Sequence, residues 1–158
     1  MKKLSLIPVI ALLLLAGINQ ASAQNKESKK QAALNELVNS RHYTFMAVNA
    51  TPLGGSTKEL TTLYTLQLKG DTLDSNLPYY GRAYVGSLTL EKSPLDFRTS
   101  DFGYQATKGK KGGWDIVITP KKGTDAREMR LSVSADGYAT LEVLNNNRDP
   151  ISFYGHMQ

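Results

Sequence analysis

Hydrophobic and polar positions alternate along most of the chain after Ser40. The segments are short, rich in Tyr, Phe, Val, Thr and Leu, and separated by Gly, Pro, Asn and Asp. Alternation with a period of two is typical of β-strands that bury one face. Outside two hairpins, the pattern predicts strands over residues 43–50, 60–69, 72–75, 82–90, 95–98 and 150–157.

The clearest hairpin spans residues 129–143. A two-residue turn at Asp136-Gly137 would mix the apolar and polar faces, whereas a three-residue loop over 135–137 keeps them apart. Gly137 then occupies the left-handed position that a type I turn with a bulge requires. The register predicted from this loop pairs Leu131 with Leu141, Val133 with Ala139, Met129 with Val143, and Arg130 with Glu142.

A second hairpin is predicted around the loop at residues 107–113. The same alternation places six side chains on one face of this hairpin: Ala106, Tyr104 and Phe102 facing Trp114, Ile116 and Ile118.

A helical pattern precedes the strands. Within residues 26–39, the apolar residues Ala33, Leu34, Leu37 and Val38 recur on one helical face, with lysines and glutamates opposite. A helix of about three turns is marginal by itself, so we expect it to dock on the rest of the protein.

Eight or more short strands after a single helix predict an all-β fold, either a small antiparallel β-barrel or a β-sandwich. A barrel is favoured because closure removes exposed sheet edges. We expect residues 24–40 to form the docked N-terminal helix. Because no repeat or linker divides the rest of the chain, residues 41–158 are expected to form one barrel domain.

Residues 1–23 have the features of a cleaved signal peptide. Lys2 and Lys3 precede a short apolar run, and Ala21-Ser22-Ala23 forms a small-residue cleavage site. The apolar run is shorter than the ~20 residues that a membrane span needs. We therefore expect export to the periplasm or the extracellular space, with no membrane span after cleavage.

Composition excludes several kinds of chemistry. The 158 residues contain no cysteine and two histidines, so disulfides, thiolate nucleophiles and cysteine-based metal sites are ruled out, and no metal or cofactor is expected. The formal net charge is +5, but removal of Lys2 and Lys3 leaves 17 basic against 14 acidic residues, an excess of +3. So small and dispersed a charge argues against a nucleic acid partner.

An enzymatic function is the weakest of the alternatives. No G-x-S-x-G motif marks a serine hydrolase. A glycan hydrolase needs two carboxylates across a cleft, for which the candidates are Asp96, Asp101, Asp115, Glu128 and Glu142. Because nothing in the pattern brings two of them together, we expect no enzymatic activity.

The most unusual stretch is residues 77–84, LPYYGRAY. Its tyrosines can line the mouth of a pocket in which Arg82 binds an anionic group. In the alternative interpretation, the tyrosines plug the open end of a barrel, while Pro78 and Gly81 set the bend. The full set of candidate ligand-binding residues is Tyr79, Tyr80, Arg82, Tyr84, Trp114 and Arg148.

The LPYYGRAY block, with Gly70-Asp71, Asn147-Arg148 and the terminal ISFYG at 151–155, resembles the domain-of-unknown-function 4251 family. Members of this family are small exported proteins of gut-type Gram-negative bacteria. The resemblance covers residues 36–157 and implies a lipocalin-like β-barrel, in agreement with the strand pattern. It implies no activity, catalytic residue or cofactor.

The sequence therefore predicts a non-enzymatic binding protein of the cell envelope, for a small amphipathic or anionic ligand. A second hypothesis is a protein–protein interaction module with a filled barrel that contacts an envelope protein. The pattern specifies no oligomeric state.

Overall fold

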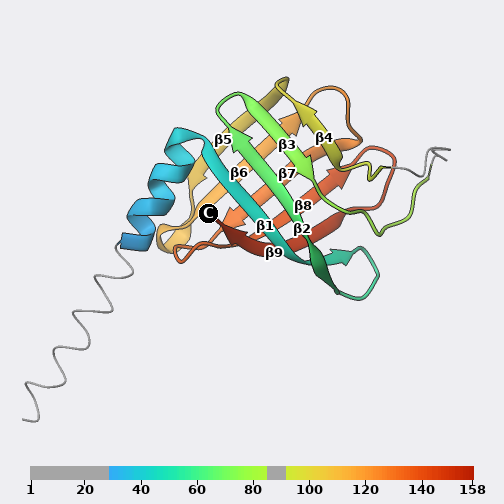
Figure 1. Cartoon of the computed structure of the whole chain (residues 1–158), viewed down its shortest axis with the longest axis horizontal. Coiled ribbons are helices and arrows are strands. Elements are labelled where there is room, and N and C mark those ends of the chain that lie inside the picture. The colour runs from blue at the N-terminus through green and yellow to red at the C-terminus, as the bar shows by residue number, and fades with distance from the viewer. Residues whose placement is uncertain (1–28, 85–91) are drawn as a thin grey trace, which may run out of the picture.

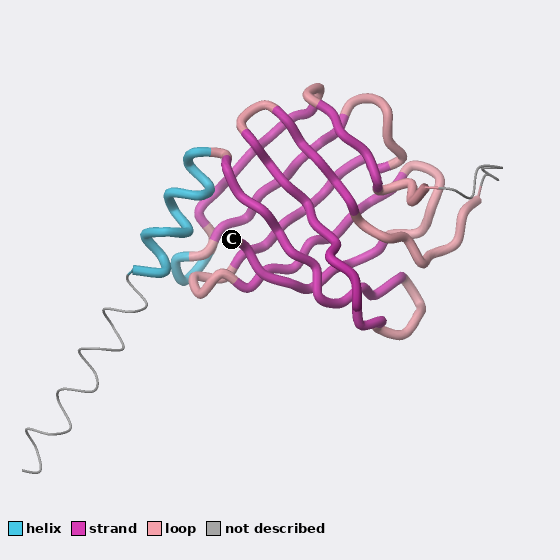
Figure 2. Tube along the Cα trace, viewed as in Figure 1, coloured by secondary structure: helices cyan, strands magenta, loops and turns pink. Residues whose placement is uncertain are grey.

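The computed structural model describes residues 29–84 and 92–158. Residues 29–40 are helical, and a 3-10 turn, η1, covers Lys110–Gly112. The described strands, drawn in Figures 1 and 2, are β1 (His42–Pro52), β2 (Lys58–Lys69), β3 (Thr72–Asn76), β4 (Asp96–Thr99), β5 (Phe102–Lys108), β6 (Trp114–Pro120), β7 (Ala126–Val133), β8 (Tyr138–Asn145) and β9 (Ile151–Met157).

Two sequence predictions lie wholly or largely outside the described residues. The expected signal peptide, residues 1–23, is one of them. The other is most of the predicted strand over 82–90, of which only the first residues are described. There, Ala83 forms an isolated antiparallel bridge with Arg148.

The strands form one antiparallel sheet in the order β4-β3-β2-β1-β9-β8-β7-β6-β5. The sheet curls into a nearly closed barrel whose two edges are β4 and β5 (Figure 1). The predicted all-β, lipocalin-like barrel is therefore confirmed. The alternative of a β-sandwich is not, because a sandwich packs two separate sheets.

Both predicted hairpins are present. In the β7–β8 hairpin, all four predicted residue pairs lie opposite each other, and Gly137 has a φ of +91°. In the β5–β6 hairpin, Ala106 lies opposite Ile116 and Tyr104 opposite Ile118, so the predicted side chains share one face. The predicted register of this hairpin is wrong by two residues, because β5 continues to Lys108, and Lys108 rather than Ala106 lies opposite Trp114.

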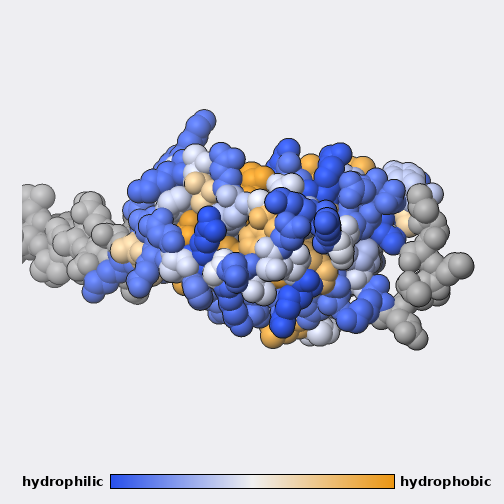
Figure 3. All heavy atoms as spheres, turned by 90° about the horizontal axis from the view of Figure 1, so that it is seen from above, coloured by the Kyte–Doolittle hydropathy of each residue, from blue (hydrophilic) through white to orange (hydrophobic). Residues whose placement is uncertain are grey.

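Buried side chains fill the interior of the barrel. Phe45, Met129, Leu141 and Phe153 are each at most 1% exposed, although they lie on four different strands. A barrel of about eight strands is just wide enough for side chains to fill it. The face of the barrel seen in Figure 3 is mainly hydrophilic, with small hydrophobic patches between polar side chains.

The N-terminal helix packs at one end of the barrel (Figure 1). Leu34 and Val38 are buried in the core, whereas Ala33 is exposed, so the buried stripe is narrower than the pattern predicted. The indole Nε1 of Trp114 donates a hydrogen bond of 2.9 Å to Oδ1 of Asn35 in the helix. Of the helices among the described residues, none combines the length and the hydropathy that crossing a bilayer requires.

Candidate functional site

The LPYYGRAY segment lies at the end of the barrel opposite the helix. Leu77 and Pro78 are buried after β3, and Tyr79 folds back over Gly81. A Cβ atom on Gly81 would lie 2.3 Å from the Tyr79 hydroxyl oxygen. Because Gly81 is not among the glycines with positive φ, this glycine supplies space for the ring rather than an unusual backbone angle.

Backbone contacts join this segment to the loop between β8 and β9. We call the joined residues 77–84 and 146–150, together with Asp125, the clasp. The amide of Tyr84 donates to the carbonyl of Asn147 at 2.9 Å, and the amide of Asp149 donates to the carbonyl of Arg82 at 3.1 Å. The backbones of the segment and the loop therefore pair like two short antiparallel strands at Ala83 and Arg148.

The hydroxyl of Tyr79 connects the two backbone segments of the clasp. It lies 2.9 Å from the carbonyl oxygens of both Arg82 and Asp149, and its single proton is shared between them. Burial raises the pKa of Tyr79, and the nearby Asp149 carboxylate raises it further. The phenol consequently stays protonated near neutral pH and remains a donor.

Within the clasp, a largely buried ion pair joins the β8–β9 loop to Asp125 of the β6–β7 loop. Arg148 Nε lies 3.3 Å from Asp125 Oδ2, and the two side chains are 17% and 15% exposed. The other oxygen, Asp125 Oδ1, accepts hydrogen bonds from the backbone amide and the side-chain amide of Asn147, at 3.2 and 3.1 Å. The Arg148 guanidinium also lies 5.6 Å from the Tyr79 ring centroid. The Arg148 side chain thus contacts other groups of the protein, the Asp125 carboxylate and the Tyr79 ring.

Four residues of the segment, Tyr80, Gly81, Arg82 and Tyr84, line an open pocket of about 520 Å³, which we call the clasp pocket. Tyr80, Arg82 and Tyr84 are exposed and contribute one side, while the β1–β2 turn contributes the other. Lys58 adds a second cation, since its Nζ atom lies 5.5 Å from the Tyr80 ring centroid. The residues that line the pocket are Pro52, Leu53, Gly54, Gly55, Tyr80, Gly81, Arg82, Tyr84 and Asp149.

Both pocket tyrosines carry neutral hydroxyls near neutral pH. Burial raises the pKa of Tyr80, with a further contribution from Tyr64. A hydrogen bond to the Asp149 carboxylate raises the pKa of Tyr84. The positive charge at the pocket therefore comes from Arg82 and Lys58, while the Asp149 carboxylate accepts a hydrogen bond from the Tyr84 hydroxyl.

The structure separates the six sequence-predicted residues into three groups. Tyr80, Arg82 and Tyr84 line the clasp pocket, and Tyr79 and Arg148 hold the clasp together. Trp114 lies at the other end of the barrel under the helix and does not join them. Tyr79 thus makes contacts within the segment and its neighbouring loop, whereas ligand binding by Tyr80, Arg82 and Tyr84 stays a prediction.

Sequence reasoning missed Leu53, Lys58, Asp125 and Asp149. Asp149 has a local signal, because it precedes Pro150 in a turn between two strands. Leu53 and Lys58 flank a Gly-Gly turn, but no local pattern relates them to Tyr80. Leu53 lines the pocket, and Lys58 lies over the Tyr80 ring, only because the β1–β2 turn lies beside the clasp.

The structure also places the five carboxylates considered for glycan hydrolysis. None of them lines the clasp pocket within the part of the chain that is described. Glu128 and Glu142 both contact Arg130, and Asp101 pairs with Lys121. No group of three or more His, Asp or Glu side chains suited to a metal ion occurs in residues 29–84 and 92–158.

Replacing Tyr79 with phenylalanine is expected to lower the free energy of unfolding by about 1–2 kcal/mol, because two carbonyls of the clasp lose their shared donor. Urea unfolding followed by circular dichroism measures this loss. The matched control is Tyr154→Phe, whose ring is half exposed on the outer face and whose effect should stay within about 0.5 kcal/mol. Equal effects of the two substitutions would contradict the role given to the Tyr79 hydroxyl.

Comparison with known proteins agrees with the resemblance seen in the LPYYGRAY block. The profile of the Domain of unknown function (DUF4251) family matches residues 25–157. Among solved structures, the chain is similar to a DUF4251 family protein from Bacteroides eggerthii, with a TM-score of 0.59 and 12% sequence identity over 85% of this chain and 90% of that chain. At this identity the likeness concerns the fold alone. None of the curated proteins matches the chain.

Proposed function

The chain belongs to the DUF4251 family, a domain of unknown function, and we propose that it binds a small amphipathic ligand with an anionic group in the clasp pocket. The observation that carries this proposal is the arrangement of Tyr80, Arg82 and Tyr84. All three side chains are exposed on one side of a pocket whose position the clasp fixes. The proposed role is binding without catalysis.

The chemistry of the pocket supports this class of ligand. Its volume of about 520 Å³ is within the range of small-molecule sites. The tyrosine rings and Leu53 offer apolar surface, while Arg82 can donate two parallel hydrogen bonds to a carboxylate, sulfonate or phosphate. Lys58 adds attraction for an anion without fixing its orientation.

The filled barrel supports a pocket at the barrel end rather than a site inside. Phe45 and Phe153 occupy the interior and are 0% and 1% exposed, so an internal ligand would have to displace packed side chains. A ligand in the clasp pocket displaces none of them. The signal-peptide features of residues 1–23 support a place in the cell envelope, in the periplasm or outside the cell.

Anilinonaphthalene sulfonate, an aromatic anionic probe, is expected to bind the full chain with increased fluorescence. In the Arg82→Ala variant the affinity should fall about ten-fold, because the main anion-binding group is lost. The melting temperature should stay nearly unchanged, because the Arg82 side chain is exposed and its backbone contacts remain.

Two controls sharpen this experiment. Arg98→Ala removes an arginine that is 73% exposed on β4 and should leave probe binding unchanged. N-phenylnaphthylamine, the same ring system without the sulfonate, should bind more weakly than the sulfonate and should not respond to Arg82→Ala. Equal loss in the Arg82 and Arg98 variants would overturn the proposal.

A second candidate function is contact with an envelope protein. The filled barrel and the exposed side chains of Leu53 and Leu63, at 66% and 61%, favour it. The probe experiment distinguishes the two candidates. A folded protein that binds neither probe at the clasp pocket would favour the protein partner.

A further inference from the structure

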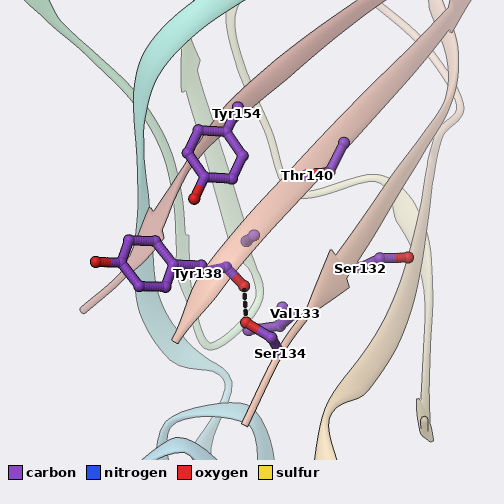
Figure 4. A pocket seen from close by; sticks show the side chains of 7 residues that line it. Ser132, Val133, Ser134, Tyr138, Thr140 and Tyr154 are labelled. Carbon is purple, nitrogen blue, oxygen red and sulfur yellow. Dashed lines mark hydrogen bonds between the residues drawn. The ribbon is translucent and has the colours of Figure 1, made fainter. Parts of the chain in front are cut away.

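Two tyrosines form an aromatic platform on the outer face of the sheet, near the barrel end where the helix packs. Tyr138 begins β8 and Tyr154 lies in β9, with their ring centroids 6.1 Å apart and their planes 6° from parallel. Figure 4 shows the two rings side by side, with both faces turned to the viewer. We propose that this platform and the pocket beside it bind a neutral saccharide.

The sheet itself fixes the position of the rings. Tyr138 lies opposite His156 and Tyr154 lies opposite Thr140, so the two tyrosines are diagonal neighbours on one face. The side chains are still 53% and 47% exposed. Tyrosine has few rotatable bonds, so a ligand that stacks on such rings orders little further motion. The two rings are thus preorganised to stack on a ligand that has a flat, partly apolar face.

The pocket beside the platform is lined with hydroxyl groups. Its volume is about 320 Å³, and the residues that line it are Ser132, Val133, Ser134, Tyr138, Ala139, Thr140 and Tyr154. None of these described residues carries a formal charge. This contrasts with the clasp pocket at the other end of the barrel, where Arg82 and Lys58 supply positive charge.

The serine hydroxyls of this pocket offer hydrogen-bond acceptors to a ligand. Ser132 donates its proton to Asp115 Oδ1 at 2.8 Å. Ser134 bonds to the carbonyl of Tyr138 at 2.8 Å, as the dashed line in Figure 4 marks, and to the Asp136 carboxylate. Because the serine protons are used within the protein, the remaining lone pairs accept hydrogen bonds from a ligand. The pocket therefore fits a ligand that brings its own hydroxyl donors.

A sugar ring combines the two features that this surface recognises, since it has an apolar C–H face and a rim of hydroxyl donors. A purely apolar ligand would remove water from the remaining serine lone pairs without replacing its hydrogen bonds. A nucleic acid would need cations for its phosphates, and the described lining residues include none. The volume is at the lower end of the usual range for ligand pockets, which corresponds to one or two sugar units of a chain.

The test uses the full chain and three neutral linear hexasaccharides: maltohexaose, cellohexaose and xylohexaose. Titration by NMR or calorimetry up to about 10 mM detects a Kd of roughly 1 mM or tighter. At least one hexasaccharide is expected to bind. The Tyr138→Ala and Tyr154→Ala variants should each lose about ten-fold in affinity, whereas the corresponding phenylalanine variants keep the rings and most of the affinity.

Tyr80→Ala is the matched control, because it removes a tyrosine that is 41% exposed at the opposite end of the barrel, and it should leave saccharide affinity unchanged. Absence of binding by all three sugars, or equal binding by the Tyr138→Ala/Tyr154→Ala double variant, would overturn the inference. So would self-association of the protein that the double variant abolishes, because the platform would then join two copies of the chain. The anionic probe reports on the clasp pocket separately, so the two proposals succeed or fail independently.

Discussion

The Gly155→Ala variant is expected to lose at least about 3 kcal/mol of unfolding free energy and to melt roughly 10 °C lower. Gly155 lies in β9 between Ala47 of β1 and Ala139 of β8. An added Cβ would lie 1.9 Å from the carbonyl oxygen of Met46 and 2.9 Å from its carbonyl carbon. Both atoms belong to the backbone, so no side-chain rotation relieves the contact. β1 has to move away from β9 at the centre of the sheet.

The local irregularity of β1 explains why the strands come so close. The pairing of β1 shifts between Ala47 and Asn49 with respect to both β2 and β9, which marks a bulge. Bulges bend a strand and increase its twist, and here the bend brings the Met46 carbonyl over Gly155. The glycine of the terminal ISFYG block is therefore required by its neighbours in the sheet.

Gly103→Ala is the control for this variant. Gly103 also lies in a strand, but its added Cβ would come no closer than 3.6 Å to Thr119, an ordinary contact. That variant should be neutral or slightly more stable, because alanine reduces the entropy of the unfolded chain. Urea unfolding and thermal melting of both variants test the difference. Similar stabilities for the two variants would contradict the close contact at Gly155.

The Asp125→Ala variant is expected to lose about 3 kcal/mol of unfolding free energy, the second largest effect. The substitution leaves the mostly buried Arg148 without its partner carboxylate, and it removes the acceptor for both amides of Asn147. Because the clasp depends on these contacts, affinity for the anionic probe at the clasp pocket should fall together with stability. Chemical denaturation and probe fluorescence measure the two effects in one set of samples.

Asp101→Ala is the matched control, since Asp101 Oδ1 also lies 3.3 Å from a cation, Nζ of Lys121. Those two side chains are 49% and 62% exposed, so their pair should contribute less than about 1 kcal/mol. The Asp125→Ala/Arg148→Met double variant should recover part of the loss, because it removes the unpaired charge. If Asp101→Ala and Asp125→Ala cost the same, burial of the Asp125–Arg148 pair has no energetic role.

The sequence predicted those features that depend on neighbouring residues. The loop over 135–137 follows from matching the apolar faces of its two strands, and the observed φ of Gly137 agrees with it. The face of each hairpin that lines the core follows from the period of two in the side chains. Tyr80, Arg82 and Tyr84 were found as candidates because they are crowded into one short segment.

The candidate site was predicted only in part, because proximity in a barrel links residues that are distant in sequence. Nothing local relates Asp125 to Arg148 or Lys58 to Tyr80. Trp114 was selected for its residue type, but the helix covers it and its indole bonds to that helix. Alternation shows which face a residue occupies, but not which strand lies beside it.

The sequence by itself therefore determined the strand-rich fold, the register of the β7–β8 hairpin and the segment that carries the candidate residues, since each depends on local periodicity and turn geometry. Only the tertiary structure decided the pairing of β1 with β9, the filled interior, the clasp and the exposed pair of Tyr138 and Tyr154. These features arise when the sheet curls into a barrel and segments distant in sequence pack against one another. Such packing depends on the whole chain, so a short window of residues does not predict it.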